Sequence, residues 1–162
     1  MAKDVESITL GIGDLSIDND DVGYLGGEVI FTANIEHTDF KVGVPMRTIK
    51  RVVLSFDASL KASLAQIDAT SIYRVLGVGR VSPNGQRITF GDQWALPELT
   101  NVKFVHTRPN GETITIVFPK AQIEPGNNEL KFSNESYTVQ SLTITANYDG
   151  TSASYPYIEF GV

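Results

Sequence analysis

The chain has 162 residues, no cysteine and a formal net charge of −6. That length predicts one domain spanning residues 1–162, large enough to bury a core, and the lack of cysteine excludes disulfide frameworks and thiolate metal sites. The negative charge disfavours binding to duplex nucleic acid. No apolar run approaches the roughly 20 residues of a membrane helix, and the first residues do not form a signal peptide, so we expect no membrane partner.

The charge is unevenly distributed along the sequence. Residues 1–40 carry one basic and nine acidic side chains, whereas residues 41–80 carry seven basic and two acidic ones. An acidic and a basic section in one subunit suit head-to-tail self-association, in which one patch meets the other on a neighbouring copy. Separate solvated faces explain the same pattern equally well.

The first expected strand, over residues 8–18, is an edge strand interrupted by two glycines and followed by a turn at 19–21. The acidic cluster at this turn, which invites comparison with a calcium loop, is Asp18, Asp20 and Asp21. Gly23 is the sixth residue counted from Asp18, but the twelfth is Val29 rather than the closing Glu of an EF-hand. We therefore expect a turn and no metal site.

Two long alternating runs, at residues 28–36 and 51–64, dominate the sequence. Side chains in a strand point to opposite faces with period two, so each run predicts a strand with one buried face and one wetted face. The apolar face of the second run is Val52, Leu54, Phe56, Ala58, Leu60, Ala62 and Leu64. Residues 52–64 would span roughly 40 Å, far more than a typical strand of about five or six residues.

The segment over residues 38–48 connects these runs and is predicted to form an extended arm. Gly43 and Pro45 disfavour a regular central strand there. Its apolar side chains either fold back on the domain or contact a partner. The candidate contact residues are Phe40, Lys41, Val42, Val44, Pro45, Met46 and Arg47.

A short helix is predicted over about 68–76, capped by Asp68. It must pack on a sheet because a helix of this length is marginal alone. Turn signals then predict hairpins over 81–90 and 102–118.

Residues 119–134 are expected to form a loop, residues 142–148 a last long strand, and residues 155–160 an apolar tail fixed to the body. The strands outnumber the single helix heavily. We therefore expect a mainly β protein, a β-sandwich or barrel with long strands, an extended hairpin arm and one short packed α-helix.

The sequence contains no recognisable catalytic constellation. His37 and His106 have neither a histidine partner four residues away nor an HExxH pattern, and we interpret them as solvated strand residues. There is no nucleophile elbow and no phosphate-binding glycine loop. Asp57 and Asp149 could resemble a glycosidase pair only if they faced each other. We expect no enzyme activity, no catalytic residue and no cofactor.

Several stretches together point to a family. They are Gly-Asp-Leu-Ser-Ile-Asp at 13–18, Asp-Val-Gly-Tyr-Leu-Gly-Gly-Glu-Val-Ile-Phe at 21–31, Phe-Lys-Val-Gly-Val-Pro at 40–45 and Ala-Ser-Leu-Lys-Ala-Ser-Leu-Ala at 58–65, before a helix ending Val-Leu-Gly at 75–77. With them the region 10–77 resembles the tail tube (major tail) proteins of tailed bacteriophages. The stretch 141–149 and the apolar tail after it are also similar to that family, whereas residues 80–135 are not.

The resemblance implies a structural virion protein that self-assembles into stacked rings, commonly hexameric, whose hollow tube carries the genome. Long strands of neighbouring subunits would close a continuous barrel, and the arm would reach a neighbouring ring. The wet strand face would line the channel, where a negative wall repels phosphates, although Arg51 and Lys61 share that face. The candidate lumen-lining residues are Glu28, Asn34, Glu36, Asp57 and Asp149.

The implied partners are further copies of the chain, other tail proteins (tape measure, terminator and, in a contractile tail, sheath) and DNA passing transiently. The implied location is the virion tail, after synthesis in the host cytoplasm. Two alternatives stay open. One is a single-ring tail, baseplate or capsid decoration protein. The other is a carbohydrate-binding β-sandwich module, which would display exposed aromatics such as Trp94 and the C-terminal tyrosines.

Overall fold

The computed structural model describes residues 13–23, 25–65, 73, 80–90, 96, 98–124 and 140–161. The strands are β1 (Asp14–Ile17), β2 (Asp20–Asp21), β3 (Ile30–Val42), β4 (Arg47–Leu64), β5 (Arg80–Val81), β6 (Ile88–Thr89), β7 (Glu98–Thr107), β8 (Thr113–Ile123), β9 (Gln140–Ala146) and β10 (Tyr157–Gly161), with a 3₁₀ turn, η1, at Ser152–Ser154. The mainly β prediction is confirmed. The predicted helix lies outside the described residues except for Tyr73, whose backbone is helical, and Trp94 also lies outside them.

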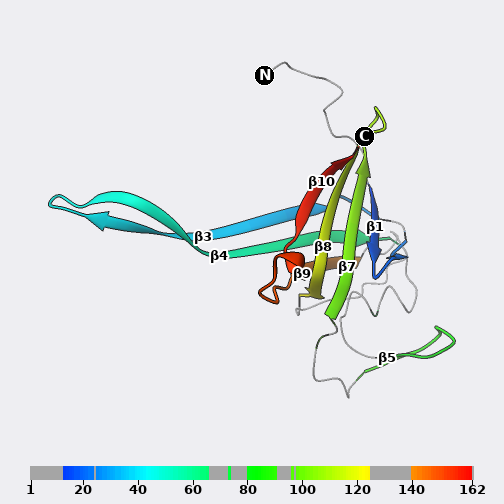
Figure 1. The fold of residues 1–162 in the computed structure, drawn as a ribbon. Helices are drawn as coiled ribbons and strands as arrows, with labels where there is room; N and C mark the ends of the chain where they lie inside the picture. The colour runs from blue at the N-terminus through cyan, green and yellow to red at the C-terminus, as the bar shows by residue number, and fades with distance from the viewer. Residues whose placement is uncertain are drawn as a thin grey trace, which may run out of the picture.

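One antiparallel sheet makes up most of the body and folds over on itself. Its strand order is β2-β1-β7-β8-β9-β4-β3, and β10 also pairs with β8. Along the edge of β8 that faces away from β7, β10 pairs with residues 113–117 and β9 with residues 121–123. The layer of β1, β7, β8 and β10 therefore crosses in front of the layer of β3, β4 and β9 (Figure 1). The sheet is not closed into a barrel.

Pro119 lies where β8 passes from one layer to the other. The β7–β8 register pairs Phe118 with Val102 and then Lys120 with Thr100, while Asn101 has a positive φ of 51°. Proline has no N–H to donate, so it is tolerated where a ladder is interrupted. The prediction of a loop from residue 119 is therefore wrong for residues 119–123, because the strand continues through its proline.

The hydrophobic core lies between the two layers. Phe31 of β3 contacts Phe118 of β8 edge to face, with 6.1 Å between ring centroids, and this pair joins the layers. The buried apolar side chains are Leu15, Ile17, Val22, Ala58, Leu60, Ala62, Leu64, Leu99, Val102, Phe104, Phe118, Ala121, Ile123, Leu142, Ile144 and Ala146. The apolar face predicted for residues 58–64 is thus confirmed as core.

The β3–β4 hairpin extends far beyond the body (Figure 1). β4 alone has 18 residues, which corresponds to roughly 60 Å of extended chain. Only residues 43–46 form the turn between the two strands, and Gly43 has a φ of +88° that favours glycine. The arm, defined here as Ile35–Phe56, is therefore a regular paired hairpin and is longer than the segment 38–48 that the sequence predicts.

Two β-bulges break the predicted alternation along the arm. Glu36 pairs with Ser55 but His37 pairs with Val53, so Leu54 is an extra residue, and Ile49 is extra in the same way near Phe40. A bulge shifts the register by one residue and re-aims side chains. The prediction that Val52 shares a face with Phe56 is consequently wrong, since Val52 pairs with Thr38 on the opposite face.

The C-terminal segment is fixed to the body as β10, which pairs with β8 from Tyr157↔Val117 to Gly161↔Thr113. This confirms the prediction for the apolar tail. The preceding strand, β9, ends at Ala146 rather than Tyr148, because the chain turns through residues 149–154 toward β10.

Candidate functional site

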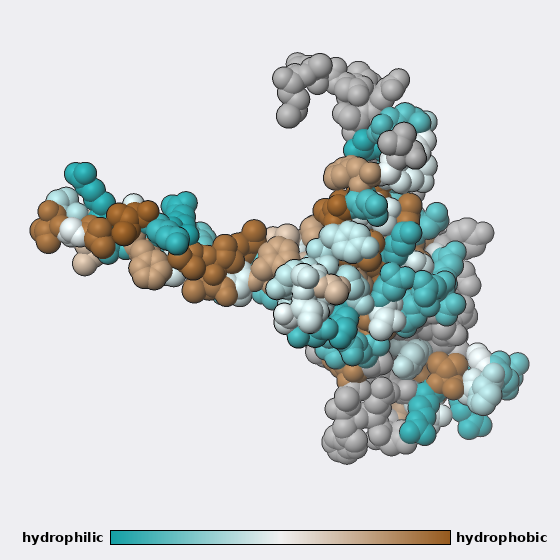
Figure 2. Space-filling view, in the orientation of Figure 1, coloured by the Kyte–Doolittle hydropathy of each residue, from teal (hydrophilic) through white to brown (hydrophobic). Residues whose placement is uncertain are grey.

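The arm carries apolar side chains that the chain itself does not cover. Val44 at the turn is fully exposed and Met46 is 77% exposed. Figure 2 shows brown apolar surface interleaved with teal polar surface along the whole arm. The nine exposed large apolar side chains of the arm are Ile35, Phe40, Val42, Val44, Met46, Ile49, Val53, Leu54 and Phe56. They include Phe40, Val42, Val44 and Met46, which the sequence selected.

Both edges of the arm lack a strand partner within the described part of the chain. β3 is the last strand of the sheet, and β4 pairs with β9 only from Ser59 to Leu64. Unpaired edges are templates for pairing with another chain. Bulges and edge lysines such as Lys41 and Lys50 limit uncontrolled pairing of such edges.

The arm is basic toward its tip. Arg51 forms an ion pair with Asp39 at 3.0 Å, and Thr48 Oγ1 donates a hydrogen bond to the same carboxylate. Among the described residues, Lys41, Arg47 and Lys50 have no ion pair, and all three are exposed. The tip therefore presents three cations next to apolar side chains.

A polar face covers the outer side of β3, β4 and β9, opposite the core. Asn34 pairs directly with Asp57, and Ser55 Oγ donates a hydrogen bond of 3.0 Å to Glu36. The polar residues that share this face are Thr32, Asn34 and Glu36 of β3, Ser55, Asp57, Ser59, Lys61 and Ser63 of β4, and Ser141, Thr143 and Thr145 of β9. Ile30, which pairs with Lys61, is an exposed apolar residue on the same face. The face thus brings Asn34, Glu36 and Asp57 together.

The remaining lumen candidates are arranged differently. Glu28 is exposed just before β3. Asp149 lies in the turn after β9, where it accepts a hydrogen bond from Thr151 and forms a 2.8 Å ion pair with Lys120 of β8. Arg51 was expected to share the polar face, but the bulge at Leu54 places it opposite Asp39 on the other face.

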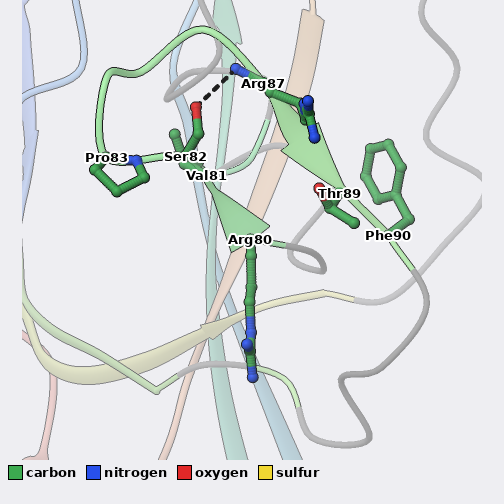
Figure 3. Close-up of a pocket in the computed structure, with 7 residues that line it drawn as sticks. All are labelled: Arg80, Val81, Ser82, Pro83, Arg87, Thr89 and Phe90. Atoms are coloured by element: carbon green, nitrogen blue, oxygen red, sulfur yellow. Dashed lines mark hydrogen bonds between the residues drawn. The ribbon is translucent and has the colours of Figure 1, made fainter.

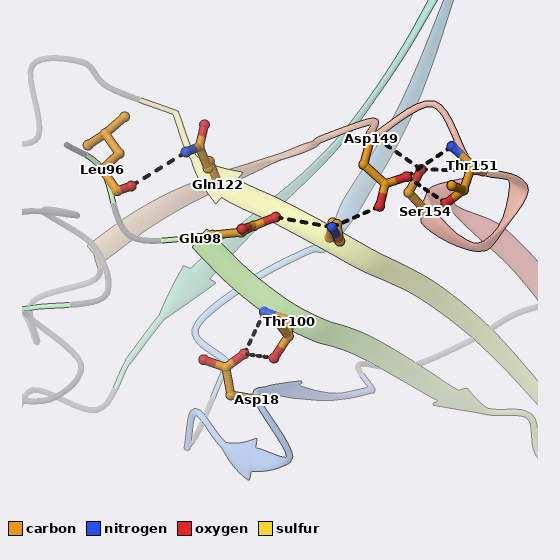
Figure 4. Close-up of polar contacts among 9 residues, drawn as sticks. Asp18, Leu96, Glu98, Thr100, Gln122, Asp149, Thr151 and Ser154 are labelled. Atoms are coloured by element: carbon orange, nitrogen blue, oxygen red, sulfur yellow. Dashed lines mark hydrogen bonds and ion pairs between the residues drawn. The ribbon is translucent and has the colours of Figure 1, made fainter.

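Asp149 contacts Lys120 near the end of β8 and Thr151 in its own turn (Figure 4). Lys120, then Thr151 and Ser154, lower the pKa of Asp149 well below its usual range by hydrogen bonding. Hydrogen bonding to Asp149 also raises the pKa of Lys120. The carboxylate charge is therefore compensated, and Asp149 serves to fix the turn between β9 and β10.

Asp18 and Asp21 of the acidic cluster hold a turn. Asp18 Oδ1 accepts hydrogen bonds from Thr100 N at 2.6 Å and Thr100 Oγ1 at 2.9 Å (Figure 4). Asp21 Oδ1 accepts one from Gly23 N at 2.8 Å. Within the described residues, no group of three or more metal-ligating side chains comes together.

Three aromatic rings connect the base of the arm to the body. Phe56 contacts Tyr148 with 6.3 Å between centroids, and Tyr148 contacts Tyr155 at 5.7 Å. Burial, and then the nearby carboxylate of Asp57, raise the pKa of Tyr148. These contacts fix the direction in which the arm leaves the body.

A second group of exposed apolar side chains lies around β10. The sequence pattern indicated only its C-terminal tyrosines, as candidate exposed aromatics of a carbohydrate-binding module. The C-terminal surface, which flanks β10 on both faces of the sheet, consists of Tyr148, Tyr155, Tyr157, Ile158 and Phe160, which are 37–69% exposed, together with the exposed Glu159. Ile158 and Phe160 lie on the face of Ile116 and Ile114, whereas Tyr157 and Glu159 lie on the opposite face. The signal for Ile158 and Phe160 was the density of large apolar residues from 155 to 160, which was interpreted as a means of fixing the tail to the body.

His106 is only 4% exposed, so its interpretation as a solvated residue is wrong. It pairs with Ile114 in the β7–β8 register and lies on the same face as Val102 and Phe104 of the core. Its Nε2 has no hydrogen-bond partner. His37, by contrast, is exposed on the arm.

An open hollow lies against the small β5–β6 hairpin (Figure 3). Its volume is about 600 Å³, and its lining includes Arg80, Arg87 and Phe90. Ser82 Oγ accepts a hydrogen bond from Arg87 N at 3.1 Å and fixes the hairpin. Neither a carboxylate nor a histidine is among its lining residues, so the hollow does not provide acid–base chemistry.

Comparisons with known proteins do not assign a family. No protein-family model matches the chain, and no curated protein matches its sequence. In the part of the chain that the structure describes, no helix is both long and apolar enough to cross a membrane.

Proposed function

We propose that this protein is a structural virion subunit that self-assembles into stacked rings and forms the tube of a phage tail. The resemblance of residues 10–77 to tail tube proteins supplies the class. The arm, with its nine exposed apolar side chains and two unpaired edges, is the observation that carries the proposal.

The arm has the properties of an element that becomes buried on assembly. Completing the burial of its nine apolar side chains would contribute about 9–17 kcal/mol, at about 1.5–3 kcal/mol for each full side chain. Association costs about 4–15 kcal/mol. A contact that covered most of the arm would therefore be stable, whereas the lone subunit leaves an apolar surface in water.

The polar face of β3, β4 and β9 supports a channel-lining role. It combines Ser, Thr and Asn side chains with Glu36 and Asp57, and it lies opposite the core-facing side of the same strands. A wall of this composition repels phosphates and offers DNA few cationic contacts. Lys61 is the one exposed cation on this face.

Negative-stain electron microscopy across a concentration series, beside sedimentation, tests the proposal. We expect hollow tubes or stacked rings of uniform diameter. A variant with residues 40–46 deleted should keep the fold by circular dichroism and lose stacking, and tubes of that variant would contradict the role of the arm.

The same images distinguish a tube subunit from the second candidate, which is a single-ring tail, baseplate or decoration protein. Such a protein would show closed rings that do not stack at any concentration. Purified wild-type protein that stays monomeric even when added to preformed rings or tubes would contradict both candidates. The exposed Tyr155 and Tyr157 would then make carbohydrate binding the next possibility, to be tested with a glycan array.

A further inference from the structure

Most of the exposed large apolar side chains of the described chain belong to two groups. One is the arm, and the other is the C-terminal surface; outside them only Ile30 and Phe90 belong to this class. In Figure 1 the arm points away from β10, so its tip lies far from the C-terminal surface of the same chain. The two surfaces meet at the base of the arm, where Phe56 contacts Tyr148, but the arm tip does not cover the C-terminal surface of its own copy.

We infer that the arm tip of one copy, Phe40–Lys50, binds the C-terminal surface of a second copy, head to tail. This inference rests on the proposed function and identifies the two surfaces that would join its subunits. A contact between unlike surfaces repeats from copy to copy and generates rings or filaments, whereas a contact between like surfaces stops at a dimer.

Charge decides between these two arrangements. Two arm tips facing each other would bring together Lys41, Arg47 and Lys50 of both copies, none of which has an ion pair within the described chain. Like charges opposite each other are unfavourable. In the head-to-tail contact these cations instead lie near the carboxylate of Glu159 of the second copy.

The C-terminal surface supplies the opposite charge. Glu159 is exposed in the middle of β10, beside its free edge, and has no ion pair among the described residues. The neighbouring cations are already neutralised, because Arg108 pairs with Glu112 at 2.9 Å and Lys120 pairs with Asp149 at 2.8 Å.

The backbone of β10 also fits a strand partner. β10 pairs with β8 on one edge, and no other described strand pairs with it. Ile158 and Phe160 are in register with Ile116 and Ile114, so they extend the apolar core face to the rim of the sheet. A hairpin with free edges and exposed apolar side chains can continue this sheet by β-augmentation.

A mixing experiment tests the inference. The arm variant, Val44→Ser with Met46→Ser, has a disrupted arm tip and an intact C-terminal surface. The C-terminal variant, Glu159→Lys with Phe160→Ser, has a disrupted C-terminal surface and an intact arm tip. All four side chains are exposed, so both variants should fold. Each alone should sediment as a monomer, and an equimolar mixture should form a heterodimer and nothing larger, because only one intact contact remains.

Phe90→Ser is the matched control, since Phe90 is 55% exposed but belongs to neither surface; it should associate like the wild type. A mixture that stays monomeric, or an arm variant that still associates alone, overturns the inference. If wild-type protein forms tubes but the two variants form no heterodimer, the further inference is wrong and the proposed function still holds. If the heterodimer forms but wild-type protein forms no rings or tubes, the proposed function is wrong and the inferred contact still holds.

Cysteine cross-linking gives a second measurement that does not require spontaneous growth. Because the chain has no cysteine, copies with Val44→Cys can be mixed under oxidising conditions with copies carrying Phe160→Cys. We expect the mixed disulfide to form at least several-fold faster than with Phe90→Cys copies. Equal rates would overturn the inference.

Reversing charges tests the ionic part of the contact, because a purely apolar contact would not respond to it. Glu159→Lys should weaken association by about two- to fivefold, as for an ion pair at a contact rim. Lys50→Glu in the arm-bearing partner should restore most of that loss. A further weakening in the doubly reversed pair would contradict the charge assignment.

Discussion

At the scale of single residues, Lys120 joins parts of the chain that are distant in sequence. Its ammonium group lies 2.8 Å from Asp149 and 3.9 Å from Glu98, so β8, the start of β7 and the turn after β9 meet at one cation. Because folding lowers the pKa of Asp149, its carboxylate stabilises the fold above about pH 4, and this contribution is lost as pH falls through the lowered pKa. Because folding raises the pKa of Lys120, its ammonium group stabilises the fold fully below about pH 10.4, and this contribution is lost as pH rises through the raised pKa.

We predict that Lys120→Met raises the pKa of Asp149 toward its ordinary value of about 3.9. The remaining hydrogen bonds that Thr151 donates from its N–H and hydroxyl to the carboxylate should keep the pKa somewhat lower. Carboxyl-carbon NMR titration measures this directly. Lys103→Met, which removes an exposed lysine of β7, is the control and should leave the Asp149 titration unchanged; an unchanged titration in Lys120→Met would show that the ion pair does not form in solution.

Phe118 is the residue whose loss should weaken the fold most clearly. It is 1% exposed and contacts Phe31 across the two layers. Phe118→Ala should lower the free energy of unfolding by about 3–5 kcal/mol, because it removes buried apolar contacts and leaves a cavity. Phe90→Ala should change it by less than about 0.5 kcal/mol. Urea unfolding of monomeric protein measures both, and equal effects would mean that the layers do not pack as described.

At the scale of elements, the arm is a hairpin whose stability comes from its own pairing. Within the described residues, most of its side chains are exposed, and Phe56 at its base contacts Tyr148. Each of the two bulges adds one unpaired residue, Leu54 or Ile49, whose side chain is about two-thirds exposed. The arm therefore adds contact surface at little cost to the core.

Replacing residues 37–54 by Asn-Gly should leave the body folded. The replacement joins Glu36 to Ser55, which are partners in the ladder, through a turn that suits a two-residue hairpin. The midpoint of thermal unfolding should change little, since the removed residues are exposed, whereas self-association should disappear. A large drop in the midpoint would show that the arm contributes to the core of the subunit.

At the scale of the whole molecule, the two faces of the β3–β4–β9 layer separate two roles. One face packs against the other layer, and the other face is polar and remains open in the subunit. In the proposed tube that open face lines the channel, so its accessibility should depend on assembly.

Cysteine labelling can measure this dependence. Asp57→Cys should react with a large polyethylene-glycol maleimide in the monomer and become protected in tubes, while a small maleimide still reaches it through the channel. Thr107→Cys, exposed at the end of β7, is the comparison and should react with the large reagent in both states. Equal labelling of the two positions in tubes would exclude Asp57 from the lumen.

The sequence predicted strands and turns correctly where a local pattern determines the backbone conformation. Alternation from Ala58 to Leu64 predicted the buried face of β4, and turn signals placed the bends at 83–85 and 109–111 where the chain does turn. It failed at Pro119 and His106, because whether a proline meets an interrupted ladder, or a histidine faces the core, depends on strands far away in the sequence.

Taken alone, the sequence determined the mainly β class, the long strands and the apolar composition of the arm, because period-two alternation and turn residues act locally. Only the tertiary structure decided which apolar residues stay exposed. The bulges at Leu54 and Ile49 shift the faces of the arm, and β10 pairs at the rim of the sheet, where side chains on both of its faces stay exposed. Both depend on strand register, which is set by pairing between distant segments rather than by the residues of one segment.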